Sequence, residues 1–217
     1  MTVRRTYVPA AGWHCTLPIY DPYVKLPGGD AIRSTLLEQM DLAPGQRVLD
    51  IGCATGTLVV VVKQLHPDIA VVGLDPDPKA LARAARKAFR AGVKVHFNRG
   101  FSDQLPYADA SFDRVSCTGM FSLLPPTEKE TTLREIRRVL RPGGSFHLFD
   151  GVKNPLGFSL WRPMLQVWLR QNQRFEVCTE GQTVALMRQA GLADARKTGQ
   201  HPFWLWPLAT YRASRPA

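Results

Sequence analysis

The chain of 217 residues is predicted to be an α/β protein with a Rossmann-like, seven-stranded, mostly parallel sheet and helices on both faces. Three observations support this prediction. Short apolar runs alternate with helical patterns, which is typical of parallel strands connected by helices. One apolar run leads into a small-residue turn at residues 50–56 (DIGCATG), and a second, at 71–75 (VVGLD), also ends in an aspartate.

The expected elements follow one another along the whole chain. Strands are expected at 46–51, 70–75, 94–99, 112–117, 145–150, about 193–200 and about 207–213. Helices are expected at 31–41, 56–65, 78–91, 127–140 and 183–190. The run from Val59 to Val62 is β-branched, but the turn before it and the strand after it favour a helix, because context overrides propensity. Thr127 and Glu130 have the spacing of a capping box for the fourth helix.

The turn at 50–56 predicts a ligand site. Gly52 and Gly56 permit backbone conformations and close approaches that a side chain would block. A ligand can therefore lie against bare backbone at the carboxyl edge of the sheet. Asp50 supplies an acceptor that suits an ammonium group better than a phosphate, and the phosphate-binding pattern G-x-x-x-x-G-K-[ST] is absent. Asp75, at the end of the next strand, has the position that binds a ribose diol.

These segments resemble the class I S-adenosylmethionine-dependent methyltransferases, in particular the small-molecule and quinone-type branch. Residues 50–56 are similar to the family motif D-x-G-x-G-x-G, and 73–78 to its ribose-binding strand end. Residues 100–113 are similar to the adenine-side loop, and 135–144 to the helix and turn before the fifth strand. The resemblance implies S-adenosylmethionine as cofactor, bound by Asp50, Gly52, Cys53, Ala54, Gly56, Asp75, Pro76, Phe101, Ser102, Asp103 and Thr118.

The chain departs from the family pattern at three places. Ala54 replaces the middle glycine of the first motif. Phe101 stands where many relatives carry an aspartate that contacts the adenine, so either Asp103 takes that role or Phe101 packs on the ring. Many relatives also carry Phe-His-His-Leu after the fourth strand, and residues 121–124 read FSLL here. A histidine base at that position is therefore lost.

A single domain is expected over residues 1–217, organised around the cofactor-binding core at 31–150. An N-terminal segment at 1–30 and a lid insert at 151–178 are expected to cover the carboxyl edge of the sheet, and 179–217 complete it. The two covering segments are rich in aromatic residues. The expected substrate contacts are Trp13, Tyr23, Phe121, Trp161 and Trp168; alternatively, the tryptophans only fill the core beneath a lid helix.

Methyl transfer from a sulfonium is an in-line displacement, in which the protein mainly aligns the reactants. A base is needed only when the nucleophile must lose a proton. The candidate bases are His14, Tyr20 and His201, with Asp21 and Tyr23 as further possibilities. No metal site is expected, since the four cysteines are scattered without metal-ligand spacing and are expected to be free thiols in a reducing cytoplasm.

The net charge of +10 is concentrated on two expected helices. Five basic residues share one face of the helix at 78–91, and this face either is simply solvated or binds a partner. No apolar run is long enough to cross a membrane, and no signal peptide is evident. The five basic residues on the face of the helix at 78–91 are Lys79, Arg83, Arg86, Lys87 and Arg90.

The sequence thus predicts a cytoplasmic S-adenosylmethionine-dependent methyltransferase acting on a lipophilic or aromatic small molecule. One alternative is a lipid or quinone methyltransferase in peripheral contact with a membrane surface. Another is a protein that binds the cofactor without methyl transfer, as a cyclase or a regulator. No nucleic-acid partner is expected, because the stretch typical of amino-directed nucleic-acid methyltransferases is absent. Neither the acceptor nor the oligomeric state follows from the sequence.

Overall fold

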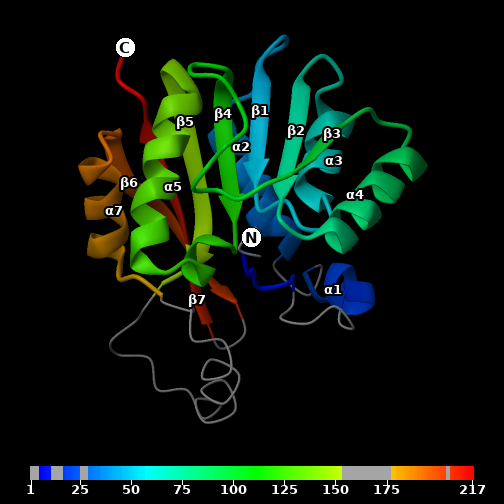
Figure 1. Cartoon of the computed structure of the whole chain (residues 1–217), viewed down its shortest axis with the longest axis horizontal. Helices are drawn as coiled ribbons and strands as arrows, with labels where there is room; N and C mark the ends of the chain where they lie inside the picture. The colour runs from blue at the N-terminus through cyan, green and yellow to red at the C-terminus, as the bar shows by residue number, and fades with distance from the viewer. Residues whose placement is uncertain (1–4, 11–16, 25–28, 153–176, 204–205) are drawn as a thin grey trace.

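A computed structural model describes residues 5–10, 17–24, 29–152, 177–203 and 206–217. Seven strands form one sheet in the order β3-β2-β1-β4-β5-β7-β6, as Figure 1 shows. The first five are parallel, and β7 runs antiparallel to both β5 and β6. This arrangement confirms the predicted fold class. The strands are β1 Arg47–Ile51, β2 Ala70–Asp75, β3 His96–Arg99, β4 Phe112–Thr118, β5 Leu140–Gly151, β6 Ala193–Phe203 and β7 Trp206–Ser214.

All five predicted helices are present with bounds shifted by a few residues, and the β-branched run after the turn is helical as expected. The helix α1, which contains Pro22, was not predicted. The helices are α1 Leu17–Val24, α2 Gly29–Met40, α3 Thr57–Leu65, α4 Pro78–Arg90, α5 Pro126–Val139 and α7 Glu180–Gln189, with a 3₁₀ turn η2 at Phe121–Leu123.

Helices cover both faces of the sheet, because successive strand residues point to opposite sides. On one face Leu49 and Ile51 pack in a cluster with Leu133 and Ile136 of α5. On the other face Val48 packs with residues of α2 and α3. Figure 1 shows α5 and α7 in front of the sheet and α2 behind it. These two apolar layers fix the position of the strand ends that carry the site.

The capping prediction for α5 was wrong. The helix begins one residue earlier, at Pro126, and Pro125 precedes it without a side-chain cap. Proline is well suited to the first helical position, where its missing N–H costs no hydrogen bond. The helix also ends earlier than predicted, because Leu140 is already extended and pairs with Phe112 of β4.

The carboxyl ends of the parallel strands meet at one edge, the lower edge in Figure 1. The strand order reverses between β1 and β4, and a ligand crevice is expected at such a switch point. The described part of the segment 1–30 lies at this edge, including α1. The predicted lid insert at 151–178, with Trp161 and Trp168, falls almost entirely outside the described residues. Among the helices that the structure describes, none is long and apolar enough to cross a membrane.

Candidate functional site

The turn after β1 is held against the end of β2. The backbone N–H groups of Gly52 and Cys53 both donate to the carbonyl of Leu74, at 2.8 and 3.0 Å. Gly52 has a φ of 72°, and a Cβ on it would lie 2.8 Å from the Met120 side chain, so the position has room for glycine alone. Ala54 is left-handed as well, with a φ of 47°. This conformation costs a non-glycine residue roughly 1–2 kcal/mol and accounts for the glycine that relatives carry there.

Asp50, at the end of β1, is a buried carboxylate with one unused oxygen. Its Oδ1 accepts a hydrogen bond from the Ser116 hydroxyl at 2.8 Å. Its Oδ2 has no hydrogen-bond partner within the described part of the chain. Burial raises the pKa of Asp50 to about 7, and the charge of Asp75 adds to this effect, whereas the bond from Ser116 opposes it. A cationic group placed beside Oδ2 would stabilise the ionised form.

Asp75, at the end of β2, connects the turn to the start of α4. Its Oδ2 accepts the N–H of Ala54 at 2.9 Å, and its Oδ1 accepts the N–H of Asp77 at 2.8 Å. Burial raises the pKa of Asp75 to about 6, although these two bonds lower it. Each carboxylate oxygen has two lone pairs, so both can still accept a ribose hydroxyl.

A pocket with a volume of about 70 Å³ lies beside these strand ends. Pockets for drug-sized ligands measure about 300–1,000 Å³, so a complete nucleoside cofactor requires some of the walls to move. Residues 6–8, which come from the N-terminal segment, and Met120, which precedes η2, are among the walls that lie outside the sheet. The pocket is lined by Thr6, Tyr7, Val8, Ile51, Gly52, Leu74, Pro76, Gly100, Phe101, Ser102, Asp103, Met120, Leu123, Leu124 and Glu128.

The predicted adenine-side residues are brought together at this pocket. The Arg5 guanidinium lies 4.3 Å from the centre of the Phe101 ring and forms an ion pair with Asp103. Ser102 is buried, and its hydroxyl is 2.8 Å from that of Thr132 on α5. The face of the Phe101 ring thus already accommodates a flat, delocalised group, the Arg5 guanidinium. An adenine stacks on the same kind of surface.

Asp21 is tied into a polar cluster that joins α1, the turn and α4. Its Oδ1 accepts hydrogen bonds from Thr55 at 2.5 Å, from Thr57 at 3.1 Å and from the Lys87 ammonium at 2.7 Å. Burial alone would raise the pKa of Asp21, but the bonds from Lys87 and Thr55 outweigh it and lower the pKa. A carboxylate stabilised in this way is a weak base, so its geometry favours anchoring α1 over proton abstraction.

Of the three predicted bases, the structure describes Tyr20 and His201. Burial raises the pKa of Tyr20 to about 12, with further contributions from Asp75, Asp21 and Asp50, so its phenol stays protonated at neutral pH. His201 lies on β6, with its ring centre 6.3 Å from that of Phe149. Its Nε2 is buried and unpartnered among the described residues. His14 lies outside the described residues.

The substrate predictions are only partly located by the structure. Phe121 is buried in η2, with the Lys129 ammonium 5.8 Å from its ring centre. Thr118, which was predicted to bind the cofactor, ends β4 and is half-buried. Trp13, Trp161, Trp168 and the side chain of Tyr23 lie outside the described part. In the described part, no group of three histidine, cysteine or acidic side chains is placed to hold a metal ion.

Several residues of the site were not predicted. Met120 packs against Gly52, and Tyr7 donates to Asp77 at 3.4 Å. Asp77 is also the N-cap of α4, where its side chain accepts the N–H of Lys79. The Asp-Pro pair before an alanine-rich helix is a usual N-cap pattern and could have identified Asp77. The contacts of Met120 and Tyr7 depend on tertiary packing and leave no signal in the sequence.

Comparison with known proteins agrees with this geometry. A family described as a methyltransferase domain matches residues 48–144, which contain the turn and both strand-end carboxylates. An uncharacterised methyltransferase of Synechocystis is 30% identical over 201 residues, which cover 90% of each chain. The present chain belongs to the class I S-adenosylmethionine-dependent methyltransferase family.

One further relative by sequence and one solved structure are also similar to this methyltransferase. A demethylmenaquinone methyltransferase of Deinococcus radiodurans is 35% identical over 118 residues, covering 54% of this chain and 48% of that protein. The chain therefore spans about half the length of that relative. The structure of phosphoethanolamine N-methyltransferase 2 of Haemonchus contortus, in complex with S-adenosyl-L-methionine, superposes with a TM-score of 0.79. It is 17% identical, and the match covers 94% of this chain and 57% of that one, which shows a shared fold.

Proposed function

We propose that this methyltransferase binds S-adenosylmethionine along the carboxyl ends of β1 and β2. The amino group of the cofactor faces Asp50, its ribose diol binds Asp75, and its adenine stacks near Phe101. The observation that carries the proposal is the buried Oδ2 of Asp50 at the glycine turn, which has no hydrogen-bond partner among the described residues. A buried carboxylate is costly unless a cation compensates it, and the cofactor is cationic at this end.

The cofactor, when bound, supplies a methyl group already activated on a sulfonium, so the chain has mainly to hold and orient the acceptor. Tyr20, protonated and half-buried near both strand-end carboxylates, is suited to donate a hydrogen bond in that role. If the acceptor has to lose a proton, His201 and His14 stay the proposed bases. Neither Tyr20 nor Asp21 has a pKa suited to this task.

We infer that the acceptor is a lipophilic or aromatic small molecule. Met120, Leu123 and Leu124 give the pocket an apolar wall on the side of η2. An apolar wall favours an acceptor that loses little hydration on entry. The relative that is named a demethylmenaquinone methyltransferase supports a quinone-like acceptor within this class.

The test supplies methyl-labelled S-adenosylmethionine together with a panel of hydroquinones, phenols, polar amines and RNA. We expect label in an organic-extractable product and release of S-adenosylhomocysteine, both strongly reduced by Asp75→Ala when the cofactor concentration is below saturation. Label only in polar amines or RNA would contradict the acceptor class. Cofactor binding without any release of S-adenosylhomocysteine across the panel would instead favour the cyclase or regulator alternative.

A further inference from the structure

One flank of the molecule, made of α4 and the edge strand β3, carries most of the excess positive charge. Residues 78–102 contain seven lysines and arginines and no aspartate or glutamate. The whole chain has a net charge of +10, so this segment alone supplies seven of those charges. Two of the seven are engaged: Lys87 pairs with Asp21, and Arg99 donates to the carbonyl of Pro76. The five other basic residues of this segment are Lys79, Arg83, Arg86, Arg90 and Lys94.

Within the described part of the chain, these five cations are not neutralised by an acidic side chain. Among the described residues, none of the five takes part in an ion pair. A second basic cluster, at and just after the end of α5, differs in this respect. It consists of Arg134, Arg137, Arg138 and Arg141. There Arg138 pairs with Asp109 and Glu135, and Arg141 pairs with Asp113. The α4 flank is therefore the part of the described surface where clustered positive charge is available to a partner.

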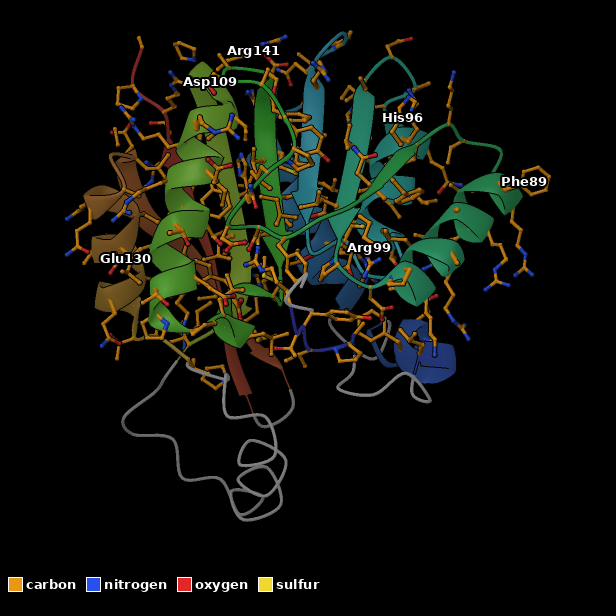
Figure 2. All side chains as sticks on the ribbon, in the orientation of Figure 1. Phe89, His96, Arg99, Asp109, Glu130 and Arg141 are labelled. Atoms are coloured by element: carbon orange, nitrogen blue, oxygen red, sulfur yellow. The ribbon has the colours of Figure 1, made fainter. Side chains whose placement is uncertain are left out.

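The same flank exposes a large apolar side chain. Phe89 on α4 is 86% exposed, and Figure 2 shows it projecting from the side of the molecule away from the sheet. Phe89 comes three residues after Arg86, so the two side chains are neighbours on the outer face of α4, and Arg90 is exposed as well. The inner face, with Ala80, Ala84 and Ala88, is buried against the sheet. An exposed aromatic ring beside several cations suits the interface of an anionic membrane, because the headgroups attract the cations and the ring can insert among them.

We propose that the α4 flank docks this methyltransferase on an anionic lipid surface. Lys79, Arg86, Arg90 and Lys94 supply the electrostatic attraction, and the Phe89 ring inserts at the headgroup level. A single exposed ring on an outer helix face favours lipid over single-stranded nucleic acid. Single-stranded nucleic acid is usually bound in a basic groove with several stacking rings. The helix begins next to Asp77, whose N–H donates to Asp75, so the N-terminal end of the docked helix, with Lys79, adjoins the pocket. Docking depends on these residues and not on the identity of the acceptor.

The test is flotation of the full chain with vesicles of phosphatidylcholine and phosphatidylglycerol in equal parts, compared with pure phosphatidylcholine. We expect binding to the anionic vesicles alone, weakened by added salt. The triple variant K79Q/R86Q/R90Q should lower the affinity roughly a hundredfold, since each basic residue near such a surface contributes a factor of about five. Phe89→Ser should lower it several-fold.

Matched controls separate docking from general effects. R134Q/R188Q/R196Q removes the same charge from α5, α7 and β6, and Leu65→Ser removes the exposed leucine of α3, which is 61% exposed. Both should bind vesicles nearly as well as the wild type, and every variant should keep normal cofactor affinity. No binding by the wild type, or an equal loss in the controls, would overturn the proposal. If the wild type binds single-stranded RNA more tightly than vesicles, and K79Q/R86Q/R90Q loses this binding, the partner of the α4 flank is nucleic acid and the lipid proposal is overturned. Vesicle binding requires no turnover, so failure here leaves the proposed methyl transfer unaffected.

Discussion

The Oδ2 atom of Asp75 accepts the backbone N–H of Ala54 at 2.9 Å, which joins the end of β2 to the turn after β1. The residue proposed to bind the ribose therefore also holds the turn that lies against the cofactor. Ala54 is in a left-handed conformation, and this bond helps to stabilise it. Asp75 thus combines an observed structural role with a proposed binding role, and substitutions can separate the two.

Asp75→Ala is expected to weaken S-adenosylmethionine binding by roughly ten- to a hundredfold, since hydrogen bonds to a charged group contribute about 1.5–3 kcal/mol. It should also lower the melting temperature, because two N–H groups lose their acceptor. Asp75→Asn keeps one oxygen for those groups and should restore more of the stability than of the affinity. Calorimetric titration and thermal unfolding of both variants provide the measurement. Equal affinity in the wild type and Asp75→Ala would remove Asp75 from the ribose site.

Gly52→Ala tests the close approach at the turn, with Gly45→Ala as its control. Both glycines have a positive φ, of 72° and 80°, so both substitutions carry the same backbone strain. A Cβ at Gly45 meets nothing within 4 Å, whereas one at Gly52 lies 2.8 Å from Met120. We expect Gly45→Ala to be destabilised by about 1 kcal/mol. Gly52→Ala should be destabilised further, because its Cβ also meets Met120, and it alone should lose most cofactor affinity. Similar affinities in the two variants would show that the cofactor does not approach Gly52.

Lys87→Met tests the polar cluster around Asp21, and Lys79→Met on the same helix is the control. Removing Lys87 leaves the Asp21 carboxylate without its cation, and we expect a loss of about 1–3 kcal/mol in unfolding free energy. Lys79 is exposed, and its substitution should change stability by less than about 0.5 kcal/mol. Denaturant unfolding measures both. Equal effects would mean that the Lys87–Asp21 contact adds nothing to stability.

Cofactor affinity is expected to rise with pH. Burial raises the pKa of Asp50 to about 7 and that of Asp75 to about 6, above the ordinary value of 3.8. The folded protein then binds protons that the unfolded chain has lost, so its stability without cofactor falls as pH rises from about 4 to about 7. A cationic ligand favours the ionised carboxylates, and its affinity should increase over the same range and level off above it. Titrations from about pH 5 to about pH 8 measure this, and Asp50→Asn should flatten the curve. Affinity that falls with rising pH would contradict the assignment of Asp50.

Periodicity and turn chemistry predicted the sheet and the cofactor edge because these features are local. Asp50 and Asp75 each follow an apolar run, and such runs become buried parallel strands wherever helices separate them. The features that were not predicted involve residues whose position depends on contacts with segments far away in the sequence. The helix α1 contains Pro22 and has weak apolar periodicity, and its stability comes from contacts such as Asp21 with Lys87.

The basic face of α4 shows the same limit. Its residues share a helical spacing, which the sequence reveals, but the inward turn of Lys87 depends on the position of α1. The capping box predicted at Thr127 failed because proline at the first helical position replaced it, whereas a true capping box forms at Thr179 and Gln182 of α7. That second box had been missed because the predicted helix began at residue 183.

The most direct test of the central claim is a crystal structure of the full chain with S-adenosylhomocysteine. We predict ribose hydroxyls within about 2.5–3.0 Å of the Asp75 carboxylate and the ligand amino group within about 2.7–3.2 Å of Asp50 Oδ2. The adenine should lie against Phe101, with residues 6–8 and Met120 displaced from their present positions. A ligand bound elsewhere, or bound here with its ribose away from Asp75, would contradict the account.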